Sequence, residues 1–302
     1  MTCVMIYHKK YCELHGILDR HFNDLLNDEE LSTIILVNFR TFRRLSWALM
    51  FSVFVVVSLV AVAPVISLIH QHFSTVYPMT YPLVYPTAYP WSLNRPGLRY
   101  KIHLIIELFA TLPQFSVTSC IDSLFMLYGF QMTSRFRLMA HRLKTIQKMT
   151  DERKVIRECV MQHQSILRSR DLLSTIFGPI VLWLMTANAI SLCTVIFQLS
   201  QMKTMTPSTI VHFMAYVIVK IIQTFMYAYT GTFLTAESEN YQQAIYDCNW
   251  HANKRLMTSV VIMLSQKPIL MTACNFSVVS LDIFVKVLNT AISYFFLLQT
   301  LS

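Results

Sequence analysis

The last apolar stretch of the chain, residues 276–301, carries polar side chains at four regularly spaced positions. They belong to Asp282, Lys286, Asn289 and Ser293. Their spacing of four, three and four residues places them on one face of a helix. A lysine at the centre of a bilayer costs about 3 kcal/mol. Such a face therefore needs water or other polar groups beside it.

That polar face has two interpretations. The two charges, one turn apart, could neutralise each other at the membrane edge, and the asparagine and serine could bond to neighbouring helices. Alternatively, the face lines water that several subunits share, because one helix cannot enclose a pore. On the second interpretation the face continues to Leu297 and Thr300.

Other reactive side chains form no recognisable catalytic site. The sequence contains no GxSxG, HExxH or CxxC motif, and its seven cysteines are widely spaced. Glu107 and Asp122 lie about four turns apart in one apolar stretch, where they predict either a cavity contact or hydrogen bonds between helices. The sequence therefore predicts no enzymatic activity, no metal site and no cofactor.

Composition indicates a membrane protein. Of the 302 residues, 54% are hydrophobic and only 14% are charged, too few charges to cover a soluble domain of this size. The net charge of +9 arises from basic residues placed between apolar stretches. That placement is typical of membrane topology and argues against nucleic-acid binding.

Five stretches are long and apolar enough for transmembrane helices, which need about 20 apolar residues. They are residues 46–70, 102–128, 173–199, 209–234 and 276–301. Proline occurs within three of them, where it predicts kinks: Pro64, Pro113 and Pro179.

Basic residues set the orientation. The segments 1–45, 129–171 and 235–275 hold nineteen Lys and Arg, against four in the intervening loops. By the positive-inside rule these segments are cytosolic, so the chain starts inside and ends outside. We therefore expect an all-α polytopic bundle over residues 46–234, with a helical stalk at 129–171 that extends below the membrane. A short packed cytosolic helix is expected over 256–264.

One extracellular loop, residues 77–90, repeats Tyr-Pro every four residues. Proline fixes its own φ and holds the preceding residue extended, so the repeat predicts a stiff strip. The strip is either a lid over a ligand entrance or an expansion without a role.

The C-terminal third resembles the insect odorant receptors. The matching segments are Tyr227-Ala228-Tyr229-Thr230-Gly231, then Tyr246 and Trp250, Gln266-Lys267-Pro268, Ser280-Leu281-Asp282-x-Phe284 and Ser293-Tyr294-Phe295. Their order and spacing before a terminal helix are more specific than any one of them. The related gustatory receptors remain an alternative, although their Thr-Tyr…Gln-Phe signature is absent here.

The resemblance implies a seven-helix subunit with an intracellular N-terminus and an extracellular C-terminus. It implies a tetrameric, non-selective cation channel in the plasma membrane of sensory neurons, in which a tuning subunit pairs with a shared co-receptor. Volatile hydrophobic odorants would bind in the outer half of the bundle. The segment 235–275 would anchor the subunits to one another, and residues 276–301 would line the pore.

The resemblance also assigns residues. The pore constriction would fall at Leu297, Thr300 and Leu301, where leucine rings close the pore by excluding water. Asn289 and Ser293, which belong to the polar face described above, would line the same pore. The anchor would use Tyr246, Trp250, Gln266, Lys267 and Pro268. Odorant pocket candidates lie on 46–70, 102–128 and 209–234; they are Met50, Phe54, Phe109, Phe115, Phe213 and Tyr216.

Two departures from the family pattern stand out. Five spans replace the expected seven, and residues 1–45 resemble the cytosolic loop after the second span, so we expect two helices to be missing upstream. This would make the chain a fragment or a decayed, non-functional copy. In addition, Ala273-Cys274-Asn275 occupies a turn where glycine and small residues are usual, which predicts strain before the last helix.

Overall fold

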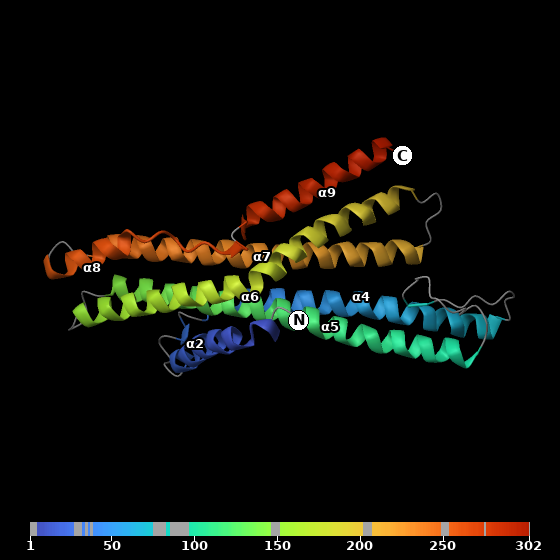
Figure 1. Ribbon diagram of the computed structural model, residues 1–302, viewed down its shortest axis with the longest axis horizontal. Coiled ribbons are helices and arrows are strands. Elements are labelled where there is room, and N and C mark those ends of the chain that lie inside the picture. The colour runs from blue at the N-terminus through green and yellow to red at the C-terminus, as the bar shows by residue number, and fades with distance from the viewer. Residues whose placement is uncertain are drawn as a thin grey trace.

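The computed structural model describes residues 5–26, 32–33, 36, 39–74, 83–84, 97–145, 152–201, 207–248, 254–274 and 276–301. Within these residues the chain forms seven helices and one pair of two-residue strands (Figure 1). In chain order they are α2 (His8–Leu26), α4 (Phe39–Ser74), α5 (Leu98–Lys144), α6 (Glu152–Gln201), α7 (Pro207–Asp247), α8 (Lys254–Leu264), β1 (Thr272–Ala273), β2 (Ser277–Val278) and α9 (Leu281–Leu301).

Four of the helices, α4 to α7, are long and apolar enough to cross a membrane. The sequence predicted these four spans, and the expected helical membrane fold is confirmed at that level. The helix α9 is not among the four, so the fifth span stays a prediction. Little of these spans is buried: 17% of the most apolar window of α4 and 33% of that of α6. Their apolar surfaces are therefore open to lipid or to other subunits.

The predicted spans are the central parts of much longer helices. The helices α5 and α6 contain 47 and 50 residues, and at 1.5 Å per residue each is about 70 Å long, more than twice the hydrocarbon core of a bilayer. Polar segments on either side of the apolar stretches continue the same helices. Similarly, α4 begins at Phe39, seven residues before the predicted start of its span.

Proline does not interrupt these helices. Pro64, Pro113 and Pro179 all lie inside continuous helices. The helix α6 changes direction about midway along its length, where Pro179 lies (Figure 1). Proline removes one backbone hydrogen bond and clashes with the preceding turn, which explains a bend at this point.

The main hydrophobic core lies where α5, α6 and α7 run side by side next to α2. Its largest fully buried side chains are aromatic: Phe125, Tyr128, Phe136, Phe177, Tyr227 and Tyr241. A second, smaller cluster joins α4, α5 and α7. Most of the fully buried side chains therefore hold the long helices together at the α2 end, away from the outer ends of α4 and α7.

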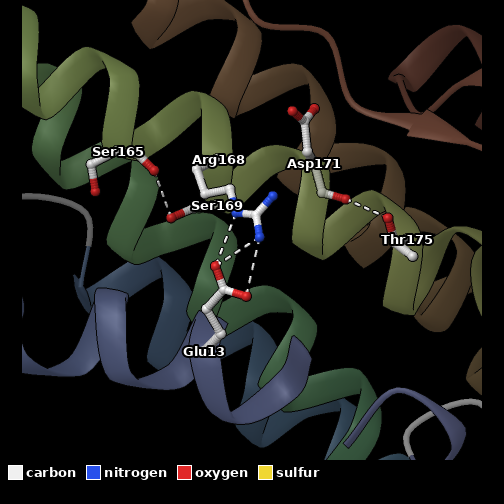
Figure 2. A network of polar contacts seen from close by, with 6 residues as sticks. All are labelled: Glu13, Ser165, Arg168, Ser169, Asp171 and Thr175. Atoms are coloured by element: carbon white, nitrogen blue, oxygen red, sulfur yellow. Dashed lines mark hydrogen bonds and ion pairs between the residues drawn. The ribbon is translucent and has the colours of Figure 1, made fainter. Parts of the chain in front are cut away.

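The helix α2 packs against α5 and α6. Leu14 and Leu18 are fully buried in the main core. Figure 2 shows Glu13 of α2 facing Arg168 of α6, whose Nε lies 2.9 Å from Glu13 Oε1. The buried Arg135 of α5 donates a 2.6 Å hydrogen bond to the backbone carbonyl of Ile17. The segment 1–45 thus contains a packed helix that the sequence did not predict.

Candidate functional site

A hollow of about 280 Å³ opens between the outer parts of three helices. Its walls are almost entirely apolar and come from α4 (Val56, Leu59, Val60), α6 (Val195) and α7 (His212, Phe213, Tyr216). The volume is near the lower end of the range for small-molecule pockets, about 300–1,000 Å³. A hollow of this size and character suits a small, mostly hydrocarbon molecule.

Two of the six predicted pocket residues, Phe213 and Tyr216, line this hollow. Phe54 and Phe115 lie elsewhere between α4 and α5, where their rings contact edge to face with centroids 6.1 Å apart. Met50 is half-buried on α4. Phe109 is 67% exposed on the surface of α5 and does not line the hollow.

The sequence does not mark the valines and leucine of α4, or Val195 of α6, as residues that line a pocket. The runs that contain them are uniformly apolar, so no residue type marks the inward positions. His212 was available as a signal, because it lies one turn before Tyr216 on the same face of α7. Its Nε2 lies 3.3 Å from the Leu59 carbonyl oxygen and so links α7 to α4.

A buried polar network connects α5 and α7 beyond the hollow. The carboxylate of Asp122 accepts hydrogen bonds of 2.6 Å from both the Gln223 amide and the Tyr227 hydroxyl. Asp122 is 4% exposed, so a charge there depends on these two donors. Of the two interpretations of Asp122, hydrogen bonding between helices is the one observed.

Glu107 has a different environment nearer the outer end of α5. Its carboxylate accepts a 2.9 Å hydrogen bond from the backbone N–H of Val84 and lies 3.3 Å from Nε2 of His103. Val84 belongs to the loop with the Tyr-Pro repeat, and most of that loop lies outside the described residues. The two acids of α5 therefore serve separate contacts.

The helix α9 packs against α6 and α7 through one side only. Val287 and Ala291 are buried on that side. The polar face defined by Asp282, Lys286, Asn289 and Ser293 is exposed, and so are its continuations Leu297 and Thr300. The Leu297 side chain is 52% exposed. The side chain of Leu301 lies outside the described residues.

The proposed anchor residues lie at the opposite end of the bundle. Tyr246 near the end of α7 is 64% exposed. Gln266 and Lys267 are exposed and Pro268 is half-buried. The amide of Gln242 on α7 donates to the Gln266 carbonyl, which ties this segment to α7. Trp250 lies outside the described residues.

The chain between α8 and α9 is seated on a row of small side chains of α7. Ser238 accepts from the Ile269 N–H at 3.0 Å, Thr235 donates to the Ile269 carbonyl at 3.1 Å, and Thr232 accepts from the Leu281 N–H at 2.8 Å. At Gly231 a Cβ atom would overlap the Val279 carbonyl. Only glycine permits this close approach of the turn before α9 to α7.

The helix α6 holds the other side of the same turn. Ser174 donates a 2.8 Å hydrogen bond to the Thr272 carbonyl in β1. Cys274 has a φ of 54°, in the left-handed region that disfavours a side chain. The strain that the sequence predicted at Ala273-Cys274-Asn275 is therefore confirmed at Cys274. The start of α9 is thus attached to both α6 and α7.

Comparisons with known proteins agree with this architecture. The family described as 7tm Odorant receptor matches residues 1–292. Odorant receptor 13a of Drosophila melanogaster is 29% identical over 159 residues, which cover 48% of this chain and 38% of the relative. The odorant receptor coreceptor of Anopheles gambiae is 25% identical over 154 residues, 49% of this chain and 32% of that protein. The matched residues span about a third of the length of these curated relatives.

The fold resembles solved olfactory receptors. The insect olfactory receptor OR5 of Machilis hrabei superposes with a TM-score of 0.81 at 12% identity, covering 100% of this chain and 77% of that chain. The structure of OR5 in complex with eugenol superposes with a TM-score of 0.76, also at 12% identity. The match covers 90% of this chain and 69% of that chain. The odorant receptor family is a non-enzymatic channel family, in agreement with the prediction from sequence. The chain therefore belongs to the insect odorant receptor family, whose members are multi-pass membrane proteins of olfaction.

Proposed function

We propose that this chain is a tuning subunit of an odorant-gated, non-selective cation channel. It assembles with a shared co-receptor in a heterotetramer, in the plasma membrane of sensory neurons. A volatile hydrophobic odorant binds between the outer parts of the helices, and α9 contributes to the pore. Its match to the odorant receptor family favours this assignment over the gustatory alternative.

The uncovered polar face of α9 is the observation that carries this proposal. One side of α9 packs against the rest of the subunit and buries Val287 and Ala291. Asn289, Ser293 and Thr300, in contrast, are exposed in the single subunit. Polar residues on an apolar helix need water or partner groups. Equivalent helices from four subunits around a shared axis would supply both.

The hollow between α4, α6 and α7 supports the ligand-binding half of the proposal. It contains Phe213 and Tyr216, two of the residues that the family resemblance assigned to the pocket. A wall of valine, leucine and aromatic carbon binds a hydrocarbon guest mainly by removing apolar surface from water.

The topology of the proposal follows the basic residues. Residues 1–45, 129–171 and 235–275 are cytosolic, and 276–301 cross the membrane to an extracellular end. Residues 46–234 contain the ligand-binding bundle, and 235–275 form the anchor, where Tyr246, Trp250, Gln266, Lys267 and Pro268 contact other subunits.

Whole-cell recording from cells that express the receptor with a co-receptor tests the pore assignment. Replacing Thr300 with valine keeps the shape of the side chain but removes a hydroxyl from the pore wall, so the reversal potential under bi-ionic conditions should shift. Replacing Leu297 with alanine widens a hydrophobic constriction, so the resting current should rise.

A matched control is Ile292→Val, which also changes an exposed side chain of α9 but lies about a quarter turn away from the polar face. It should leave selectivity and resting current unchanged. Wild-type selectivity and leak in both the Thr300 and Leu297 variants, at normal surface expression, would refute a pore-lining role for α9.

A further inference from the structure

One cation stands beside the hollow. The Lys220 ammonium lies 5.3 Å from the centre of the Tyr216 ring, and Tyr216 forms part of the wall. His212, Tyr216 and Lys220 are spaced four residues apart, so they follow one another along one face of α7. The backbone of Lys220 therefore lies about one helical turn further along α7 than that of Tyr216, and Lys220 itself is not among the residues that line the hollow.

The depth of Lys220 prevents it from reaching bulk water along the membrane surface. Eleven residues separate it from Thr209, where the apolar part of α7 begins, which corresponds to about 16 Å. That is about half the thickness of the hydrocarbon core. A lysine side chain is too short to extend its charge from there to either headgroup layer. Its charge must therefore be matched inside the bundle.

Asp122 lies within electrostatic range of Lys220. Each oxygen of the Asp122 carboxylate already accepts a short hydrogen bond, one from Gln223 and one from Tyr227. Among the ion pairs of the described residues, none joins Lys220 to an acid. The ammonium lies over the Tyr216 ring, and none of the hydrogen bonds among the described residues uses its N–H donors. Ammonium donors thus remain for a guest in the hollow.

We infer that the hollow selects small apolar molecules that carry an oxygen acceptor at one end, such as a carbonyl or a carboxylate. The acceptor binds the Lys220 ammonium, and the hydrocarbon end lies along Val56, Leu59 and Val60 of α4. An ammonium has three donors and no acceptor, and its hydrogen bonds to oxygen strengthen with the negative charge on that oxygen. This inference rests on the proposed function, because it takes the hollow as the odorant pocket.

Binding to the purified receptor in nanodiscs tests the inference without relying on channel activity. Three probes share a six-carbon chain and differ in the head group: hexane, hexanal and hexanoate. Thermophoresis should give at least tenfold tighter binding of hexanal and hexanoate than of hexane. Equal affinity for the three probes in the wild-type receptor would overturn the inference, and this comparison needs no variant.

Variants assign the preference to one side chain. Lys220→Met keeps a similar length without charge, and it should weaken hexanal and hexanoate binding at least tenfold while leaving hexane binding unchanged. Lys220→Arg should retain most of the preference. Lys154→Met, which removes an exposed lysine at the far end of α6, should behave as wild type. Full hexanoate affinity in Lys220→Met would overturn the assignment.

Recording from cells that also express a co-receptor separates this inference from the proposed function. Odorant-evoked currents with no preference for oxygen acceptors would overturn the inference and leave the proposed function standing. Acceptor-selective binding in nanodiscs without evoked current in any co-receptor pairing would refute the proposed function and support the inference about the hollow.

Discussion

Replacing Gly231 with alanine should displace the start of α9 from α7. The added methyl group would occupy the position of the Val279 carbonyl, a backbone group that cannot rotate away as a side chain can. The turn before α9 would have to move outward from α7. Since the Leu281 N–H is bonded to Thr232, the residue directly after Gly231, that movement would also lengthen this hydrogen bond.

Three contributions set the size of the effect. Forcing a methyl group into a filled position costs about 1–3 kcal/mol. Losing the Leu281–Thr232 hydrogen bond adds about 1 kcal/mol. Alanine in a helix gains about 1 kcal/mol over glycine, which offsets part of the cost. The net penalty is about 1–3 kcal/mol, which lowers the equilibrium constant for seating α9 on α7 by about five- to 150-fold.

Evoked current and thermal stability together measure this penalty. Gly231→Ala should reduce odorant-evoked current strongly at normal surface expression and should lower the melting temperature in detergent. Gly16→Ala is the matched control, because no atom of another residue lies within 4 Å of a methyl group there. That variant should be slightly more stable than wild type, since it gains helix propensity alone.

Similar behaviour of Gly231→Ala and Gly16→Ala would contradict a steric role for Gly231. Equal melting temperatures and equal currents would mean that the turn accommodates the methyl group without cost. The close contact between α7 and the turn before α9 would then not constrain α9.

Two further predictions concern contacts between helices. Tyr227→Phe removes one of the two hydrogen-bond donors to Asp122. Loss of a hydrogen bond to a buried charge costs about 1.5–3 kcal/mol in soluble proteins. Hydrogen bonds between helices in membrane bundles average only about 0.6 kcal/mol. A double-mutant cycle with Asp122→Asn should give a coupling above 1 kcal/mol if the network is kept dry, and a value near zero would show that it is not. At the α2 contact, Glu13→Gln should cost under about 0.5 kcal/mol because the Glu13 and Arg168 side chains are 41% and 59% exposed, whereas Leu18→Ala should cost about 2–5 kcal/mol. Denaturation in detergent compares the two variants, and a larger loss in Glu13→Gln would contradict this ranking.

Apolar length and basic-residue placement were sufficient to predict four spans, because a bilayer imposes the same requirement on any sequence. The exposed stripe on α9 was predicted equally well, since the spacing of Asp282, Lys286 and Asn289 fixes their common face whatever lies around them. Helix ends were less predictable. Polar residues after 128 continue α5, and nothing local marks its end before Lys144.

Contacts between distant segments could not be predicted from local pattern. The hydrogen bond from Arg135 to the Ile17 carbonyl joins residues more than a hundred positions apart, and either residue alone looks like part of a solvated segment. The hollow was predicted only in part for the same reason. Phe213 and Tyr216 were chosen for their aromatic rings, whereas Val56 and Val195 line the space because of how α4 and α6 approach α7.

The separation of the main core from the hollow has an evolutionary consequence. Tyr128, Phe136 and Tyr241 belong to the core that packs α5, α6 and α7 beside α2, whereas the hollow lies towards the opposite ends of α6 and α7. Substitutions at Val56, Val60 or Phe213 can therefore change the shape and chemistry of the hollow without removing the contacts that keep the chain folded. A scaffold arranged in this way can diversify its chemical preferences quickly, because new specificities need not be accompanied by compensating repairs to stability.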